Sequence, residues 1–160
     1  MSPAGDRYSA AEQVLGYLYQ ARLALLRLLQ LPESDSVLIE KDDDLEFTDQ
    51  AGIKSLNSLK HKAPGDRLAD LGVDFWKSVR IWLSRYQRDG RTASSLKFFL
   101  LTTGVVADDS FLAQLLPHTQ RDRSILSGLA EEALTKSDSK TIRPIAGQFN
   151  ALQQKRRQTS

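Results

Sequence analysis

The spacing of apolar residues changes several times along this chain, and these changes constrain its fold more than any other feature. Apolar residues first recur at helical intervals up to about Gln30, where Leu31-Pro32 ends the run; they include Val14, Leu15, Leu18, Leu25, Leu26 and Leu29. Short segments with strand character follow at 36–40, 44–48 and 53–61. The first part of the chain therefore predicts a helix followed by a β-meander.

The second part of the chain predicts a helix, a strand and further helices. A helical stripe begins after Asp70 or Asp74 and ends before Asp89-Gly90; it contains Phe75, Val79, Trp82, Leu83 and Tyr86. Trp76 and Trp82 are expected to pack in the core, although the six helical steps between them allow one of them to reach the surface. The almost continuously apolar segment 95–102 predicts a central strand that is covered on both faces. Beyond Asp108 the apolar spacing is helical again, which predicts a mostly helical C-terminal third.

Length and composition favour one globular domain. The chain has 160 residues, of which 41% are hydrophobic and 26% are charged, and this predicts a single domain over 1–160 with flexible ends at 1–8 and 154–160. Its basic end suggests the N-terminal part of a longer effector. It shows neither a signal-peptide pattern nor an apolar run of membrane-spanning length, so we expect a cytoplasmic protein.

Residue usage restricts the chemistry. The chain has no Cys and only two His residues, His61 and His118, which excludes thiol catalysis and disulfides and disfavours a zinc centre. A metal ion in this protein is therefore expected to be a hard cation that oxygen atoms hold. The net charge of +2 is too small to predict nucleic-acid binding by itself.

An acidic cluster lies at the start of one predicted strand, and a lysine lies at the end of the next. The cluster is Asp42 to Asp44, and the lysine is Lys60. Because side chains two apart on a strand share a face, Ser58 and Lys60 should point the same way while Leu59 faces the core. Carboxylates that hold a divalent cation beside an ammonium group are the arrangement that metal-dependent phosphodiester cleavage needs.

Several segments occur in the order found in one protein family: GYLYQ at 16–20, IEKDDDLEF at 39–47, SLKHK at 58–62 and DFWKSVRIW at 74–82. With them, over roughly the first two thirds of its length, the chain resembles the double-stranded DNA nuclease domain of the PD-(D/E)xK, restriction-endonuclease-like superfamily. Such domains head bacterial antiphage defence effectors of the CBASS, HerA-coupled and STAND NTPase-linked types. The resemblance implies an α/β fold whose central mixed sheet, of about four or five strands, is flanked by helices.

The resemblance also implies roles for individual residues. Asp43 or Asp44 would be the first metal ligand, Lys60 the catalytic lysine, and Gln20 and Glu40 supporting residues. The implied reaction is hydrolysis of DNA phosphodiester bonds by metal-activated water, with Mg²⁺ or Mn²⁺ as the cofactor and little sequence specificity.

The chain departs from the superfamily pattern at Ser58. Two residues before the catalytic lysine the superfamily carries Asp or Glu, and this branch often Gln. A serine hydroxyl at this catalytic position lacks the charge and the reach of a carboxylate. Two functions therefore stay open: an active endonuclease, or a catalytically inactive module of the same fold that serves DNA binding or oligomerisation.

The expected partners follow from the same resemblance. Double-stranded DNA would be held by sequence-independent phosphate contacts from Lys54, Lys62 and Arg67. A sensor or ATPase of the defence system, such as a HerA-like or STAND NTPase or a cyclic-nucleotide sensor, would control the domain. Cutting both strands needs two sites close together, so we expect a homo-oligomer when the domain is active.

Overall fold

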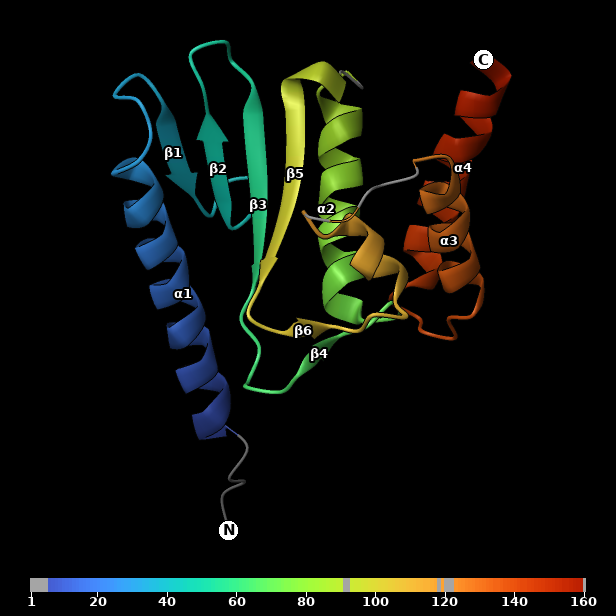
Figure 1. The fold of residues 1–160 in the computed structure, drawn as a ribbon, viewed down its shortest axis with the longest axis horizontal. Coiled ribbons are helices and arrows are strands. Elements are labelled where there is room, and N and C mark those ends of the chain that lie inside the picture. The colour runs from blue at the N-terminus through green and yellow to red at the C-terminus, as the bar shows by residue number, and fades with distance from the viewer. Residues whose placement is uncertain (1–5, 91–92, 118, 120–122, 160) are drawn as a thin grey trace. The chain divides into compact units, whose positions relative to one another are not determined.

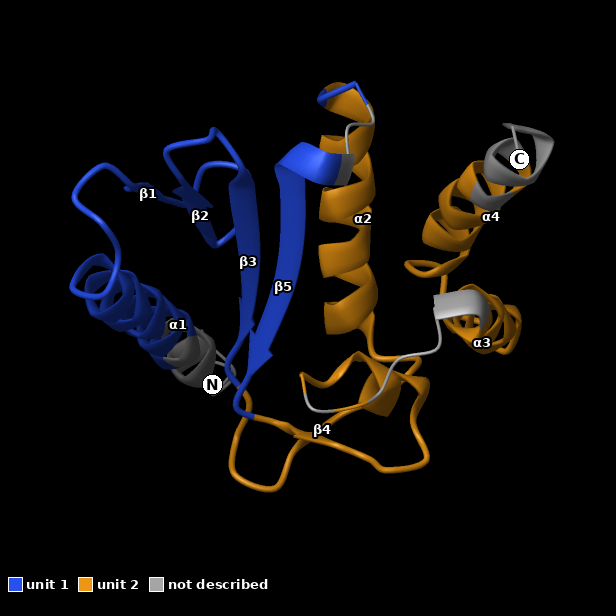
Figure 2. Cartoon of the chain, turned by 45° about the horizontal axis from the view of Figure 1, so that its top comes forward, with its two compact units in different colours: residues 1–61, 89–103 blue, residues 62–88, 104–160 orange. Residues whose placement is uncertain are grey.

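The computed structural model describes residues 6–90, 93–117, 119 and 123–159. The chain divides into two compact units, which Figure 2 distinguishes by colour: unit 1 comprises 1–61 and 89–103, and unit 2 comprises 62–88 and 104–160. Of the ends that we expect to be flexible, 1–5 and 160 lie outside the described residues, whereas 6–8 and 154–159 are helical. The single domain over 1–160 stays a prediction.

Unit 1 is built on a four-stranded mixed sheet in the order β1-β2-β3-β5 (Figure 1). Its strands are β1 (Ser36–Ile39), β2 (Leu45–Thr48), β3 (Lys54–Lys60) and β5 (Leu96–Thr102). The first three pair antiparallel, as the β-meander predicts, and β5 pairs parallel to β3. Together with the helices, this sheet confirms the α/β class and a mixed sheet of four strands.

Helix α1 (Asp6–Leu28) packs on one face of this sheet. The core between them centres on Ala24, Leu45 and Leu59, with these partly buried side chains around it: Tyr19, Leu23, Val37 and Phe47. Alternation along the strands explains the set, because Leu45 pairs with Asn57 and Leu59 lies two residues further on the same face. The prediction that Leu59 faces the core is therefore confirmed.

The position of β5 differs from our expectation of a central strand. β5 is the last strand of the described sheet and pairs with β3 alone. Phe99 is about half exposed, and Lys97 is exposed. The face of β5 that carries these two residues is therefore not fully covered, contrary to the expected burial on both faces, and an apolar run carries no information about the number of neighbouring strands. The sequence therefore misplaced this strand in the sheet order.

Unit 2 is mostly helical. It contains α2 (Val73–Arg88), α3 (Arg123–Thr135), α4 (Arg143–Thr159), the 3₁₀ segment η2 (Phe111–Leu115) and a small parallel sheet of β4 (Arg67–Leu68) and β6 (Val105–Val106). A second 3₁₀ segment, η1 (Ala93–Ser95), precedes β5 in unit 1. The helical C-terminal third is confirmed. Among the described residues, none of the helices is long and apolar enough to cross a membrane.

Trp76 lies at the centre of the aromatic packing in unit 2. Its ring centroid lies 5.0 Å from that of Phe75 and 6.1 Å from that of Phe111, and its Nε1 donates to the Asp70 carbonyl at 2.6 Å. The Asp70 carboxylate accepts hydrogen bonds from the Ser110 hydroxyl and from the N–H groups of Phe111 and Leu112. Asp70 therefore fixes the start of η2 beside α2, and the buried position expected for Trp76 is confirmed.

Helix α4 was not predicted as a separate element. The basic tail suggests a frayed end, yet the helix runs from Arg143 to Thr159, and Ile142 and Ile145 are buried. Pro144 in its first turn is a helix-start signal, and Ile145, Phe149 and Leu152 follow at helical spacing. The polar composition of the last residues concealed this pattern.

Candidate active site

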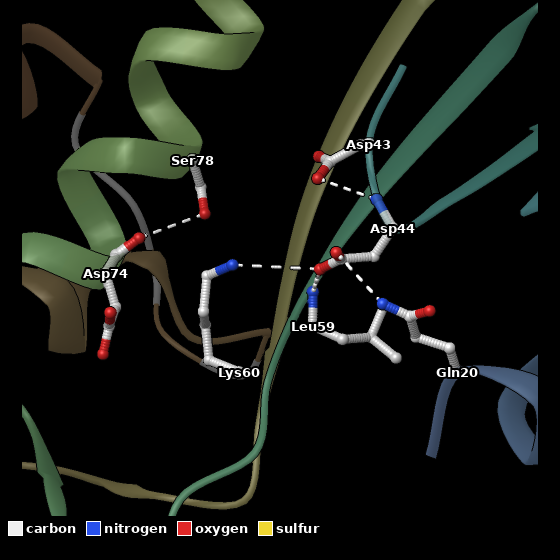
Figure 3. A network of polar contacts seen from close by, with 7 residues as sticks. All are labelled: Gln20, Asp43, Asp44, Leu59, Lys60, Asp74 and Ser78. Atoms are coloured by element: carbon white, nitrogen blue, oxygen red, sulfur yellow. Dashed lines mark hydrogen bonds and ion pairs between the residues drawn. The ribbon is translucent and has the colours of Figure 1, made fainter. Parts of the chain in front are cut away.

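Asp44 and Lys60 lie together at one end of the sheet. Asp44 immediately precedes β2, and Lys60 is the last residue of β3. Antiparallel pairing of these strands brings the start of one beside the end of the other. The Lys60 Nζ lies 3.8 Å from the Asp44 Oδ2, and both side chains are partly exposed (Figure 3). The sequence predicted this meeting of carboxylate and ammonium groups.

The Asp44 carboxylate is held in a fixed orientation by its neighbours. Its Oδ2 accepts the Leu59 N–H at 2.5 Å, and its Oδ1 accepts a hydrogen bond from the Gln20 Nε2 at 3.2 Å. The Asp43 Oδ1 accepts the Asp44 N–H at 3.0 Å, which fixes the backbone before β2 (Figure 3). Helix α1 and strand β3 therefore both orient Asp44, and the role of Asp43 as a metal ligand stays a prediction.

Gln20 carries an unsatisfied oxygen beside this carboxylate. Its side chain is 8% exposed, and its Oε1 is buried and has no hydrogen-bond partner among the described residues. A buried acceptor without a partner costs about 1–3 kcal/mol. A ligand that offers positive charge or a proton would remove this cost. The sequence identified Gln20 as a supporting residue, and the structure places it in contact with Asp44.

Ser58 is buried in the strand that carries Lys60. Its exposed fraction is 0%, and it lies two residues before Lys60 on the same face of β3. The neighbouring pair Leu45–Asn57 places Ser58 and Asp44 next to each other in the continuing register. A short neutral side chain therefore lies beside Asp44 in the sheet.

The oxygen atoms of Asp44 and Gln20 fit a hard divalent cation that binds to the protein through few ligands. Among the residues that the structure describes, no group of three or more His, Cys, Asp or Glu side chains could hold a metal ion. Asp44 supplies a carboxylate, and a half-turn of the Gln20 amide would present the unsatisfied Oε1 on the same side. Mg²⁺ often binds through one or two carboxylates and keeps several waters. Weak binding of Mg²⁺ or Mn²⁺ is what these groups allow.

Glu40 contributes to the turn between β1 and β2. Its side chain is exposed, and its N–H donates to the Asp44 carbonyl at 3.1 Å, which closes the turn. Its φ of 55° lies in the left-handed region, which is unfavourable for a residue with a Cβ. In the structure, Glu40 therefore contributes to the site through its backbone. Its supporting role in catalysis stays a prediction.

Replacing Glu40 with glycine should raise the free energy of unfolding by about 0.5–1 kcal/mol, because glycine adopts positive φ without steric cost. Urea unfolding followed by far-ultraviolet circular dichroism measures the change. The control is Glu40→Ala, which removes the same charge but keeps the Cβ. Equal gains in both variants would show that charge repulsion from the neighbouring aspartates, and not the backbone conformation, is the cause.

The predicted DNA-binding residues belong to different parts of the structure. Lys54 begins β3 and pairs with Glu46 at 3.6 Å, and Lys60 lies six positions further along the strand, about 20 Å away. Lys62 and Arg67 belong to unit 2, where Lys62 forms an ion pair with Asp74 and Arg67 is exposed on β4. The contact of these residues with DNA stays a prediction.

Unit 2 contains a cavity of about 460 Å³ that sequence reasoning did not predict. Its lining includes Asp70, Asp108, Asp109, Glu132 and Lys136. The Lys136 Nζ donates to the Glu132 Oε1 at 2.7 Å, and this hydrogen bond holds the pKa of the Glu132 carboxyl below its ordinary value. Asp70 is engaged in fixing η2. These contacts account for Asp70, Glu132 and Lys136 as local structure.

Comparisons with protein-family models, with curated proteins and with solved structures found no match for this chain. The class that the structure defines is an α/β protein with a four-stranded mixed sheet and two C-terminal helices.

Proposed function

We propose that this chain is a metal-dependent endonuclease domain that cleaves double-stranded DNA with little sequence specificity. The observation that carries the proposal is the 3.8 Å approach of the Lys60 Nζ to the Asp44 Oδ2 at the adjoining ends of β2 and β3. The resemblance of four segments, in order, to the nuclease domains of bacterial antiphage effectors supports it further. Control by a sensor or ATPase of such a system belongs to the same proposal.

The proposed role of Asp44 is to hold Mg²⁺ or Mn²⁺ together with the Gln20 oxygen. The cation would supply a Lewis acid for the phosphate and lower the pKa of an attacking water. The hydrogen bond from Leu59 to Asp44 keeps one carboxylate oxygen in place, and Asp43 fixes the backbone that carries it. Because the carboxylate is already fixed, the cation that it holds would need no rearrangement when negative charge develops on the phosphate.

The proposed role of Lys60 is to place a positive charge against the scissile phosphate. Its ammonium is partly exposed and lies beside, but not tightly on, the Asp44 carboxylate. Part of its hydrogen-bonding capacity is therefore available to a phosphate oxygen. Stabilising the charge that develops in the transition state is usually the largest single electrostatic contribution to catalysis.

Cleavage of supercoiled plasmid tests the proposal. The purified protein should produce nicked and then linear plasmid with Mg²⁺ or Mn²⁺, and excess chelator should stop the reaction. High protein concentration favours cutting of both strands, because two sites must act close together. If the plasmid stays intact with either metal at high protein concentration, the endonuclease proposal fails.

A second candidate function is a catalytically inactive module that binds DNA or oligomerises. Two observations favour it: the neutral Ser58 at a carboxylate position and the lack, among described residues, of a three-residue acidic or histidine metal cluster. Fluorescence anisotropy with labelled duplex DNA distinguishes the two functions. Salt-sensitive binding without plasmid cleavage would support the inactive module.

Ser58→Asp should make the stability of the protein depend on metal ions. Without metal, the new carboxylate is buried, and the free energy of unfolding should fall by about 2–4 kcal/mol. With Mg²⁺ or Mn²⁺ near Asp44, the carboxylate gains a partner, so part of the loss should be recovered. Thermal unfolding with and without metal measures both changes.

Ser78→Asp is the matched control for this experiment. Ser78 is as fully buried as Ser58, but it lies on α2, where its hydroxyl donates to the Asp74 carbonyl at 3.2 Å. This variant should lose stability and show no metal-dependent recovery. Equal recovery in both variants would argue against a metal site at Asp44 and Ser58.

A further inference from the structure

Helix α1 exposes an unusually apolar face. Its large apolar side chains there are between 45% and 79% exposed; they are Val14, Leu15, Tyr17, Leu18, Leu25, Leu26 and Leu28, followed by Leu29 just beyond the helix. The opposite face of α1 carries Gln20, Leu23 and Ala24, which pack towards the sheet. Contiguous exposed apolar patches larger than a few hundred Å² are rare on monomeric proteins and mark interaction sites.

The exposed residues are spaced like those of a helix that pairs with a second helix. Successive steps of three and four residues lead through Ala11, Val14, Leu18, Ala21, Leu25 and Leu28; we call these residues the α1 stripe. All of them are exposed. This alternation, over about two and a half heptads, places side chains along one seam that a second helix with the same spacing can fill. A two-fold symmetric pair satisfies the pattern with two identical stripes.

The exposed area is large enough for a stable dimer. The eight exposed large side chains present on the order of 800 Å² of surface, so a contact that buries both the α1 stripe and the residues that flank it reaches the area that each partner contributes to a standard stable interface. Leu15 and Leu29 flank the α1 stripe and widen it beyond the narrow seam of a coiled coil. This wider contact offsets the small area that a heptad pattern of this length would bury by itself.

Charge argues against a nucleic acid or a membrane surface as the occupant of this face. Arg22 is the sole charged residue in the sequence from 13 to 26. Helices that lie on membranes usually carry Lys and Arg on the polar face, whereas this helix presents Gln20, Leu23 and Ala24 to its own sheet. A nucleic acid or an acidic peptide would need several cations. A second apolar helix is the partner that fits.

We propose that two copies of this chain form a dimer by pairing the exposed α1 stripes. Leu18 and Leu25 would be the central contacts, because they are more than half exposed and lie one heptad apart. Ala21 lies between them, and its small side chain allows the two helices to approach closely. This inference does not depend on the proposed nuclease function.

Light scattering after size exclusion tests the dimer over about 1–100 µM protein, the range that resolves micromolar affinities. The expected mass is twice the 17.9 kDa chain mass. Leu18→Glu combined with Leu25→Glu should raise the dissociation constant at least about 100-fold, because the seam would contain desolvated like charges. The matched control, Ser84→Glu with Gln87→Glu on exposed α2 positions, should stay dimeric.

A single introduced cysteine gives a second measurement that does not require the charged variant to fold. The chain has no cysteine, so mild oxidation of Ala21→Cys should give a covalent dimer if the two stripes meet near Ala21. A disulfide needs Cα atoms within about 7 Å. Ser84→Cys on the exposed surface of α2 should cross-link more slowly.

The dimer proposal is overturned by any of several results. One is a wild-type protein that stays monomeric at every concentration, whether or not it associates with lipid vesicles or other proteins. Another is a dimer that keeps its mass when Leu18 and Leu25 are both replaced by glutamate. A broad mass distribution would indicate unspecific aggregation and would also overturn it. Equal cross-linking of both cysteine variants would exclude the α1 stripe as the contact.

Discussion

Replacing Lys60 with alanine should reduce metal-dependent plasmid cleavage at least about 100-fold, since the loss of one preorganised electrostatic group commonly costs this much in rate. The Lys60 ammonium is the positive group that the structure places 3.8 Å from the Asp44 carboxylate. Removing a partly exposed ion pair changes stability by about 0–1 kcal/mol. The variant should therefore fold, and its loss of activity should report on catalysis. Initial rates of plasmid nicking measure the effect.

Two further variants make this test specific. Lys97→Ala removes an exposed lysine from strand β5 of the same sheet and should cleave at the wild-type rate. Lys60→Arg keeps the positive charge but changes its shape and reach, so it should retain part of the activity if charge is the main requirement. Wild-type cleavage by Lys60→Ala would refute the assignment of Lys60 to the catalytic site.

Trp76→Ala should lower the free energy of unfolding by about 3–5 kcal/mol, the range found for large aromatic residues truncated in cores. The Trp76 side chain is 1% exposed and packs against Phe75 and Phe111. Truncation would also leave the Asp70 carbonyl without the hydrogen bond from the indole Nε1. Because whole domains are stable by only about 5–15 kcal/mol, unit 2 should be largely unfolded at mildly elevated temperature.

Urea unfolding of neighbouring variants gives the comparison for Trp76. Lys77→Ala changes an exposed residue of the same helix and should lie within about 0.5 kcal/mol of the wild type. Trp76→Phe keeps an aromatic ring and should lose less than Trp76→Ala. A Trp76→Ala variant as stable as Lys77→Ala would contradict the aromatic packing described for unit 2.

Much of the secondary structure was predictable because it is encoded locally. Periodicity identified α1, the β-meander, α2 and β5 within a few residues of their bounds. The two-residue strands β4 and β6 carry no periodic signal and were missed. The helical C-terminal third was predicted, but the separate helix α4 was not, although Pro144 and Ile145 mark its start; its last residues were expected to be frayed because they are polar and basic.

The candidate site was predictable in part. Antiparallel strands that follow each other must bring the start of one beside the end of the other, so the approach of Asp44 and Lys60 follows from the order of the segments. The distance of Lys54 from this pair also follows from the length of β3. The contact of Gln20 with Asp44 joins a helix to a strand end, and no local pattern specifies it.

By itself, the sequence determined the order and type of most elements and the pairing of a carboxylate with an ammonium group at adjoining strand ends. The tertiary structure alone decided that β5 is the last strand of the described sheet, that the Gln20 oxygen is buried without a partner, and that the α1 stripe faces outwards. The reason is physical. Helix and strand periods depend on neighbours within a few residues, whereas the face that a helix buries depends on contacts between segments far apart in the chain.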